Sequence, residues 1–208
     1  MSQRFTLRSG RGLMAVVSRL CLAQQDEADA LLSRDPFSLL CGMLLDQQFA
    51  MEQAFRGPQK IAERLEMKKL DAGRIAAMEP AAFSAICSKV PAIHRYPGSM
   101  AGRIQQLAAF VSTTYSGDVT KIWADVKTGD ELLNRLKGLP GFGEQEAKIF
   151  LALLGKQLGV RPKGWRTSAG DYGLNGSRRS IADVTSPKTL EEVRAFKQEL
   201  KAAAKTRA

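Results

Sequence analysis

Apolar residues recur at the 3.6-residue spacing of an α-helix along most of the chain. This pattern covers residues 14–33 and Met51–Leu65, while Phe37–Gln48 is nearly all apolar until its polar end. The segment Phe37–Gln48 indicates a buried central helix whose C-terminal end meets a polar environment. We expect the helix over Met51–Leu65 to bend or restart at Gly57-Pro58, because proline has no amide hydrogen for a helix interior.

Helical patterns continue toward the C-terminus and are separated by short loops. The segment 90–98 contains Pro91 and Pro97 and predicts a loop. Thr189, with Glu192 three positions later, predicts the capping box of a last helix. The helices expected after residue 70 cover residues 71–78, 81–89, 99–115, 122–126, 130–136, 144–158 and 189–203.

The composition supports an all-α fold, because aromatic residues are only 7% of the chain and strand-forming runs are scarce. A hydrophobic content of 44% is sufficient for a packed core. We expect a flexible basic tail over 1–13, a two-lobed helical domain over 14–188, and a C-terminal helix with a basic tail over 189–208. Within the domain, we expect a helix-hairpin-helix over about 130–158 and an inserted basic loop over about 159–170. The whole Gly-, Pro- and Arg-rich stretch 159–188 is a long ordered loop or partly mobile.

The N-terminal segment leaves two other interpretations open. The chain could begin at Met14, or residues 1–24 could be a secretion signal. The signal resemblance is faint, because Arg19 interrupts the apolar run and no convincing cleavage site follows.

Charge indicates a polyanionic partner. The formal net charge is +10, and residues 156–208 carry 12 Lys and Arg against 5 Asp and Glu. Such a balance fits nucleic acid and also an anionic membrane surface. The apolar runs are too short to span a bilayer. Three widely spaced cysteines predict reduced thiols rather than disulfides or zinc ligands, and so a cytoplasmic protein.

The string Leu139-Pro140-Gly141-Phe142-Gly143 lies between two helical patterns. Its glycines permit backbone angles that a side chain opposes, and the helix after Gly143 begins with amides that lack partners within the helix. These amides could bind a phosphate, while Leu139 and Phe142 anchor the turn from beneath. The alternative is an ordinary connection between two helices of a bundle.

The segment Leu139 to Phe150 resembles the helix-hairpin-helix motif of the base-excision DNA glycosylase superfamily. The upstream segment from Asp35-Pro36-Phe37 to Leu65, with Asp46-Gln47-Gln48, resembles the helix and glutamine turn of the same family. The likeness covers about residues 35–175 and is strongest to a little-characterised bacterial branch without an iron–sulfur cluster. It implies a two-lobed helical glycosylase fold that binds double-stranded DNA near the nucleoid.

The resemblance implies that the target nucleotide leaves the duplex and that Gln48, with Gln47 beside it, fills the vacated space. A helix cap or a buried amide is an equal alternative for Gln48. A catalytic Asp is expected about 20–25 residues after Pro140, but 160–165 contains no carboxylate. The first Asp downstream is Asp171, which we take as catalytic; a surface Asp that caps a turn is the alternative.

The remaining site residues follow from the same resemblance. Gln145 stands where lyase-active members carry a lysine, so no lyase step is expected, and Lys148 meets phosphate or solvent. Trp165 and Tyr172 could stack on an extruded base, although Trp165 could equally be a core residue. His94 is expected to be structural. The residues expected to bind backbone phosphates are Arg161, Lys163 and Arg166, with Arg178 and Arg179 as further candidates.

These expectations combine into one leading function and two alternatives. The leading one is a monofunctional DNA glycosylase that removes damaged bases, with alkylated bases as candidates, as a monomer and without a metal or other cofactor. The first alternative is a DNA-binding protein with this fold that has lost the chemistry. The second is a protein that binds a membrane surface.

Overall fold

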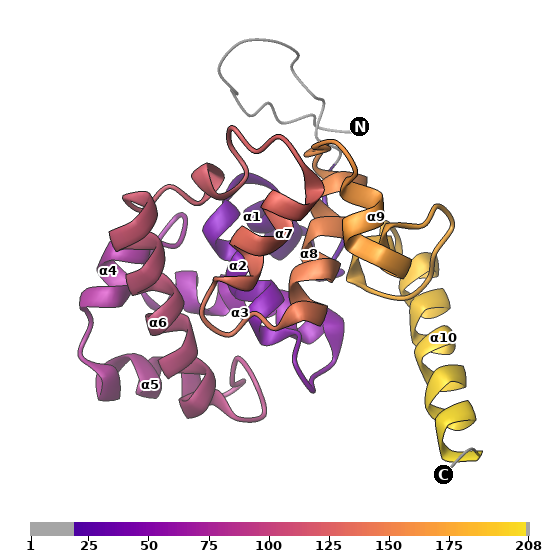
Figure 1. Ribbon diagram of the computed structural model, residues 1–208. Helices are drawn as coiled ribbons and strands as arrows, with labels where there is room; N and C mark the ends of the chain where they lie inside the picture. Colours follow the sequence, from indigo (N-terminus) through magenta and orange to yellow (C-terminus); the bar gives the residue numbers. More distant parts are fainter. Residues whose placement is uncertain (1–18, 207–208) are drawn as a thin grey trace.

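The computed structural model describes residues 19–206, and its elements are all helical (Figure 1). The expected tail over 1–13 therefore lies outside the described residues. Within them the all-α expectation is confirmed, and the only extended pairing is one isolated bridge between Thr128 and Lys163. The elements are α1 (Asp26–Arg34), α2 (Pro36–Leu45), α3 (Met51–Arg64), α4 (Ala72–Ala77), α5 (Pro80–Ser88), α6 (Pro97–Tyr115), η1 (Val119–Ile122), α7 (Gly129–Lys137), α8 (Glu144–Gln157), α9 (Trp165–Ala169), η2 (Gly170–Gly173), η3 (Ile181–Asp183) and α10 (Pro187–Thr206).

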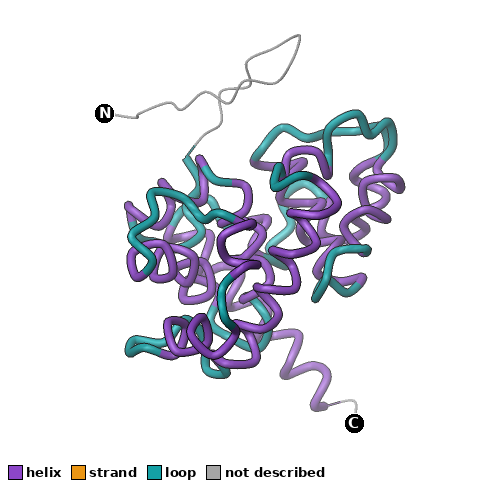
Figure 2. Tube along the Cα trace, turned by 90° about the vertical axis from the view of Figure 1, so that its left-hand side faces the viewer, coloured by secondary structure: helices purple, strands orange, loops and turns teal. Residues whose placement is uncertain are grey.

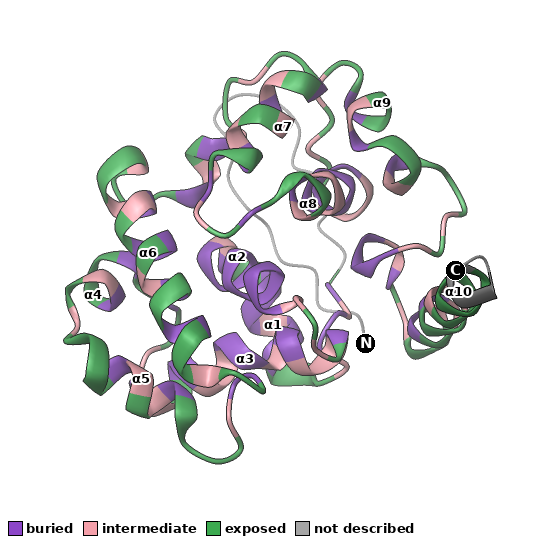
Figure 3. Ribbon diagram, turned by 60° about the horizontal axis from the view of Figure 1, so that its bottom comes forward, coloured by how far each residue is buried: buried purple, intermediate pink, exposed green. Residues whose placement is uncertain are grey.

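Helix α2 lies at the centre of the molecule, as its nearly continuous apolar sequence predicts. Every residue from Phe37 to Leu45 is buried, and the surrounding helices cover all sides of α2 (Figure 3). Asp35 caps the buried N-terminus by accepting hydrogen bonds from the amide of Phe37 at 3.3 Å and from the amide of Leu70 at 2.9 Å. This cap satisfies polar groups that water cannot reach.

Two groups of helices flank α2 (Figure 1), and the trace consists of helices joined by loops (Figure 2). In one group α4 and α5 pack on α6, and in the other α7, α8 and α9 pack together. Helix α2 contacts α3, α6 and α8, so it joins the two groups through one continuous hydrophobic core. The C-terminal helix α10 begins beside η3 and then extends away from the body (Figure 1).

The helix over Met51–Leu65 differs from the sequence expectation. Helix α3 runs through Pro58 without a break. Close packing beside Pro58 holds the helix together at this point, because a Cβ on Gly57 would lie 2.4 Å from Cδ1 of Leu45 on α2. Tertiary contact therefore outweighs the local preference of proline, and the predicted restart is wrong.

The expected loop over 159–170 is partly helical. Gly164, with a φ of 76°, precedes the short helix α9. Trp165 then enters the core, where its ring packs on Gly155 of α8: a Cβ there would lie 2.4 Å from the ring. One buried aromatic residue thus fixes a segment whose composition predicts a loop.

The last helix begins earlier and ends later than expected. Helix α10 starts at Pro187, and the amide of Ser186 donates to Oγ1 of Thr189 at 2.9 Å. The amide of Thr189 donates back to Oγ of Ser186 at 3.2 Å. The capping pair is therefore Ser186 and Thr189 rather than Thr189 and Glu192. None of the described helices is long and apolar enough to cross a bilayer.

Candidate nucleic-acid interface

The turn between α7 and α8 is anchored on the central helix. Leu139 and Phe142 are buried, and the amide of Phe142 donates to the carbonyl of Leu139 at 3.0 Å. Gly141 has a φ of 83°, and a Cβ there would lie 2.5 Å from Cδ1 of Leu44. Glycine is required at this position for two reasons, the backbone angle and the approach to α2. The expected anchoring of the turn by Leu139 and Phe142 is confirmed.

The first turn of α8 presents backbone amides beside this hairpin. Gly143 is its N-cap, and no side chain of the described residues caps the helix there. Glu144 pairs with Lys148 at 2.7 Å and with Lys137 at 3.8 Å, and the hydrogen bond from Lys148 is the main cause of its lowered pKa. Lys148 therefore contacts a carboxylate in the free protein, and the two lysines neutralise the charge of Glu144 beside the amides.

The glutamine turn between α2 and α3 is bonded directly to the hairpin. Nε2 of Gln47 donates to the carbonyl of Gly141 at 2.9 Å, and Nη1 of Arg103 donates to Oε1 of Gln47 at 3.0 Å. Gln48 has a φ of 55°, in the left-handed region, and its exposed side chain accepts a hydrogen bond from Arg95. The two glutamines therefore differ: Gln47 links two elements, and Gln48 projects from a strained turn.

His94 holds the glutamine turn from behind. Its Nδ1 accepts from the amide of Tyr96 at 3.1 Å, so the proton is on Nε2, which donates to the carbonyl of Gln47 at 3.0 Å. The ring is 3% exposed and packs on Phe49. Burial lowers the pKa of His94, which favours this neutral form. These contacts give His94 a structural role, in agreement with the sequence interpretation.

A cleft of about 1300 Å³ opens beside the glutamine turn and the first turn of α8. Its walls come from the start of α3, the loop before α6, η2 and α10. Gln48 and Gln145, from the glutamine turn and the first turn of α8, both line the cleft, and partly exposed Tyr172 lines it as well. The basic residues that line it are Arg95, Lys148, Arg179, Arg194, Lys197 and Lys201.

Asp171 lies in η2 and lines the same cleft as Gln48 and Gln145. Its side chain is 67% exposed, and its Oδ2 is 3.3 Å from Nη2 of Arg179. The carboxylate is thus within reach of a molecule bound in the cleft, and an arginine holds it there. The carboxylate accepts no capping hydrogen bond from another described residue, which separates Asp171 from a simple turn cap.

The cleft holds a second carboxylate that sequence reasoning did not single out. Asp46 follows α2 directly and lines the cleft while half-buried. Burial, followed by the charges of Glu52 and Glu146, raises its pKa to about 7, although Lys197 acts in the opposite direction. The only sequence indication was its position next to the glutamine pair, because the groups that surround it come from distant segments.

Four of the expected site residues do not line the cleft. Nε of Arg161 donates to the carbonyl of Gly155 at 2.8 Å and so caps the end of α8. Nη2 of Arg166 donates to Asn175 at 2.7 Å, and its guanidinium stacks on Trp165. Lys163 is exposed but does not line the cleft. Trp165 is 6% exposed and packed on α8, so the expectation that its ring lines a base pocket is wrong.

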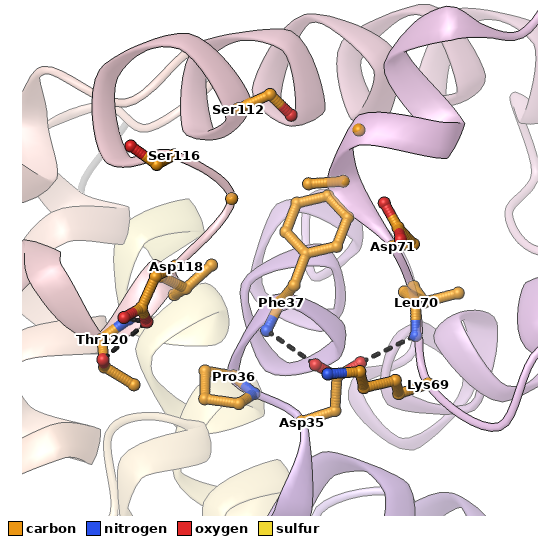
Figure 4. A pocket seen from close by; sticks show the side chains of 14 residues that line it. Asp35, Pro36, Phe37, Lys69, Leu70, Asp71, Ser112, Ser116, Asp118 and Thr120 are labelled. Atoms are coloured by element: carbon orange, nitrogen blue, oxygen red, sulfur yellow. Dashed lines mark hydrogen bonds between the residues drawn. The ribbon is translucent and has the colours of Figure 1, made fainter. Parts of the chain in front are cut away.

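A second cavity of about 670 Å³ lies between α2, α4 and the end of α6 (Figure 4). Three aspartates line it, but each serves as a helix cap: Asp35 for α2, Asp71 for α4 and Asp118 for η1. Because these carboxylates already accept backbone hydrogen bonds, the cavity has a structural explanation and is not the candidate site.

None of the three cysteines lines the candidate cleft. Cys41 and Cys87 are buried and Cys21 is partly exposed, all three as free thiols. Burial raises the pKa of Cys87 to about 12, so this thiol is not a nucleophile at neutral pH. No group of three or more His, Cys, Asp or Glu residues in the described part of the chain could hold a metal ion.

The chain matches no protein-family model and no curated protein sequence. Its function must therefore be inferred from its own residues: a hairpin and a glutamine turn that are bonded together, beside a basic cleft lined by the carboxylates of Asp46, Glu52 and Asp171.

Proposed function

We propose that this protein binds double-stranded DNA and excises a damaged base by hydrolysing its N-glycosidic bond, as a monofunctional glycosylase of the helix-hairpin-helix type. The hydrogen bond between Gln47 and the carbonyl of Gly141 carries this proposal. It joins two motifs that are 94 positions apart in sequence, and Gln48 beside one motif and Gln145 just after the other line the same cleft. In this proposal the two helix groups around α2 would act as the two lobes of such an enzyme.

The hairpin and the first turn of α8 would bind the DNA backbone. Their amides are held rigidly, because Gly141 packs on Leu44. An anion is stabilised at the N-terminus of a 14-residue helix by the free amides and by the helix dipole. When a phosphate approaches, Lys148 can leave Glu144 and contact the phosphate instead.

Gln48 would enter the duplex where the target nucleotide leaves it. The side chain is exposed, projects from a left-handed residue and is held by Arg95. The cleft beside it exceeds the range of about 300–1,000 Å³ that is usual for ligand pockets. It therefore has room for a base with part of its sugar and phosphate, and Tyr172 supplies an aromatic face for stacking.

Asp171 would supply the negative charge that the reaction needs. As the base departs, positive charge develops on the sugar, and a nearby carboxylate stabilises it or activates the attacking water. Because Gln145 cannot form a Schiff base with the sugar, the reaction stops at the abasic site.

The alternative function is a DNA-binding protein without glycosylase activity. Two observations favour it: residues 160–165 contain no carboxylate, and Asp171 is largely exposed and paired with Arg179. A charge that water and arginine already stabilise assists a cationic transition state less than a desolvated one does.

A panel of duplexes, each with one modified base, distinguishes the two functions. The protein is incubated with each duplex, and strand breaks are counted before and after alkali. A glycosylase without lyase activity gives breaks only after alkali on at least one duplex, and Asp171→Asn lowers that yield. Binding to every duplex without any alkali-sensitive product supports the alternative function.

A further inference from the structure

Asp46 is a carboxylate in the candidate cleft that has no structural role of its own. Its side chain is half-buried, and among the described residues no donor forms a hydrogen bond or an ion pair with it. The backbone amide of Asp46, and not the carboxylate, makes the terminal helix bonds, to Gly42 at 3.1 Å and to Met43 at 3.2 Å. The carboxylate is thus free to face the cleft.

The position is unfavourable for a charged carboxylate. Asp46 stands at the C-terminal end of α2, where the helix dipole is negative and repels an anion. Partial burial removes water that would stabilise the charge. An uncompensated group in such a place indicates a function rather than a contribution to folding.

Groups on three other elements face this carboxylate. Glu52 of α3 and Glu146 of α8 oppose its ionisation, and Lys197 of α10 favours it. Oε1 of Glu52 pairs with Nη2 of Arg194 at 2.6 Å, and this ion pair keeps Glu52 charged. Its Oε2 is buried and has no hydrogen-bond partner among the described residues. The net effect is a pKa of about 7, so a large share of Asp46 carries its proton at neutral pH.

We propose that Asp46 donates a proton to the departing base, and this role rests on the glycosylase function proposed above. It lines the cleft together with Asp171 and Gln48, so a base in that cleft meets both carboxylates. The two then have different tasks: exposed Asp171, paired with Arg179, acts as the anion, and half-buried Asp46 acts as the acid.

The reaction balances with water as the only co-reactant. The bond between C1′ and the base nitrogen breaks, and both electrons leave with the base. The proton of Asp46 goes to a ring nitrogen of the base, which is released neutral. Water adds its oxygen to C1′, and its proton goes to Asp171 and then to solvent. Asp46 regains a proton from solvent, so both carboxyl groups return to their starting states.

The experiment compares two leaving groups in Asp46→Asn under single-turnover conditions. Hypoxanthine needs a proton to leave as a neutral base, whereas 7-methylguanine is already cationic and leaves neutral without one. We expect Asp46→Asn to slow the release of hypoxanthine by about 100-fold or more and that of 7-methylguanine by less than about threefold. Asp46→Glu should restore part of the lost rate, and the exposed Asp125→Asn serves as the matched control.

The outcomes separate this proposal from the glycosylase function. Release of both bases by the wild type, with equal slowing in Asp46→Asn or with none, overturns the proton-donor role alone. No base release from any duplex overturns both proposals. A carbon-13 NMR titration of the Asp46 carboxyl does not depend on activity: a midpoint near neutral pH, raised in Lys197→Met and lowered in Glu52→Gln, supports the role, and a midpoint below about 5 overturns it.

Discussion

At the residue scale, two of the groups proposed to act on DNA occupy positions that destabilise the fold. Asp46 is half-buried beside two glutamates at a helix C-terminus, and Gln48 adopts a left-handed backbone. Neither feature strengthens the fold, since an unpaired carboxylate and a strained residue each lower the free energy of unfolding. Both residues line the same cleft.

Asp46→Asn should stabilise the protein above neutral pH. The pKa of Asp46 is about 7 in the folded protein, compared with 3.8 for an ordinary Asp side chain. Folding is therefore favoured while the carboxyl group is protonated. That advantage is complete below about pH 4 and disappears as the pH rises through 7. We therefore expect no gain from the substitution at pH 4 and a gain of about 1–2 kcal/mol at pH 8, measured by urea unfolding. A loss at pH 8 would contradict the assigned environment.

Gly141→Ala should lower the free energy of unfolding by more than the backbone angle alone explains. Gly141 has a φ of 83° and packs on Leu44, while Gly164 has a φ of 76° with open space around it. We expect Gly164→Ala to lower the free energy of unfolding by about 1 kcal/mol and Gly141→Ala by about 2–4 kcal/mol. Thermal or urea unfolding gives both values. Equal losses would mean that the turn is not packed on α2.

At the element scale, the glutamine turn and the hairpin act as one unit. Gln47 bonds to the hairpin carbonyl of Gly141, Arg103 holds Gln47, and His94 holds the backbone of the same turn. A change in the position of the hairpin is thereby transmitted to Gln48, the residue proposed to enter the duplex.

Substitutions of Gln47 and Gln48 should affect different properties, the stability of the fold for Gln47 and base extrusion for Gln48. Gln47→Ala removes the link to the hairpin and should lower the free energy of unfolding by about 1 kcal/mol. Gln48→Gly relieves the left-handed residue and should leave stability unchanged or raise it by up to about 1 kcal/mol. Extrusion, followed with a fluorescent base analogue in the duplex, should fall strongly in Gln48→Gly. Normal extrusion in this variant contradicts the role of Gln48.

The helices α2, α6 and α8 were predictable from sequence to within a few residues. The helical pattern over 14–33 was a poorer guide, because residues 19–25 are not helical and α1 covers only Asp26–Arg34. The departures arise where one tertiary contact outweighs local preference. Gly57 packs on Leu45 and keeps α3 continuous through Pro58, and Trp165 packs on Gly155 and draws α9 out of the expected loop. Neither contact is visible to a pattern that considers one segment at a time.

At the scale of the whole molecule, the cleft is assembled from segments that are far apart in sequence. Its basic residues come partly from α10, which the sequence places only as a terminal helix. The high positive charge of the C-terminal quarter predicts an anionic partner, but it does not identify the residues that line the cleft. Asp46 was missed for the same reason, because its environment is created by α3, α8 and α10.

Salt dependence should show which cations meet DNA. Lys201 lines the cleft, whereas Lys163 is exposed outside it. Each lost phosphate contact lowers the slope of log affinity against log salt by about 0.9. We expect this change in Lys201→Gln and none in Lys163→Gln, measured by fluorescence anisotropy with a duplex from low to moderate salt. The reverse result would move the interface to the loop before α9.

The most direct test of the proposed interface is a map of amide chemical shifts on binding a duplex with a stable abasic-site analogue. If the hairpin, glutamine turn and cleft form one DNA-binding face, the amides of Gln48, Gly141 and Gly143 should shift strongly, with those of the cleft wall around Asp171. The amides of Lys163 and of Gly117, beside the second cavity, should not shift. Shifts that cluster at Lys163 or Gly117 and spare Gly141 would contradict the account.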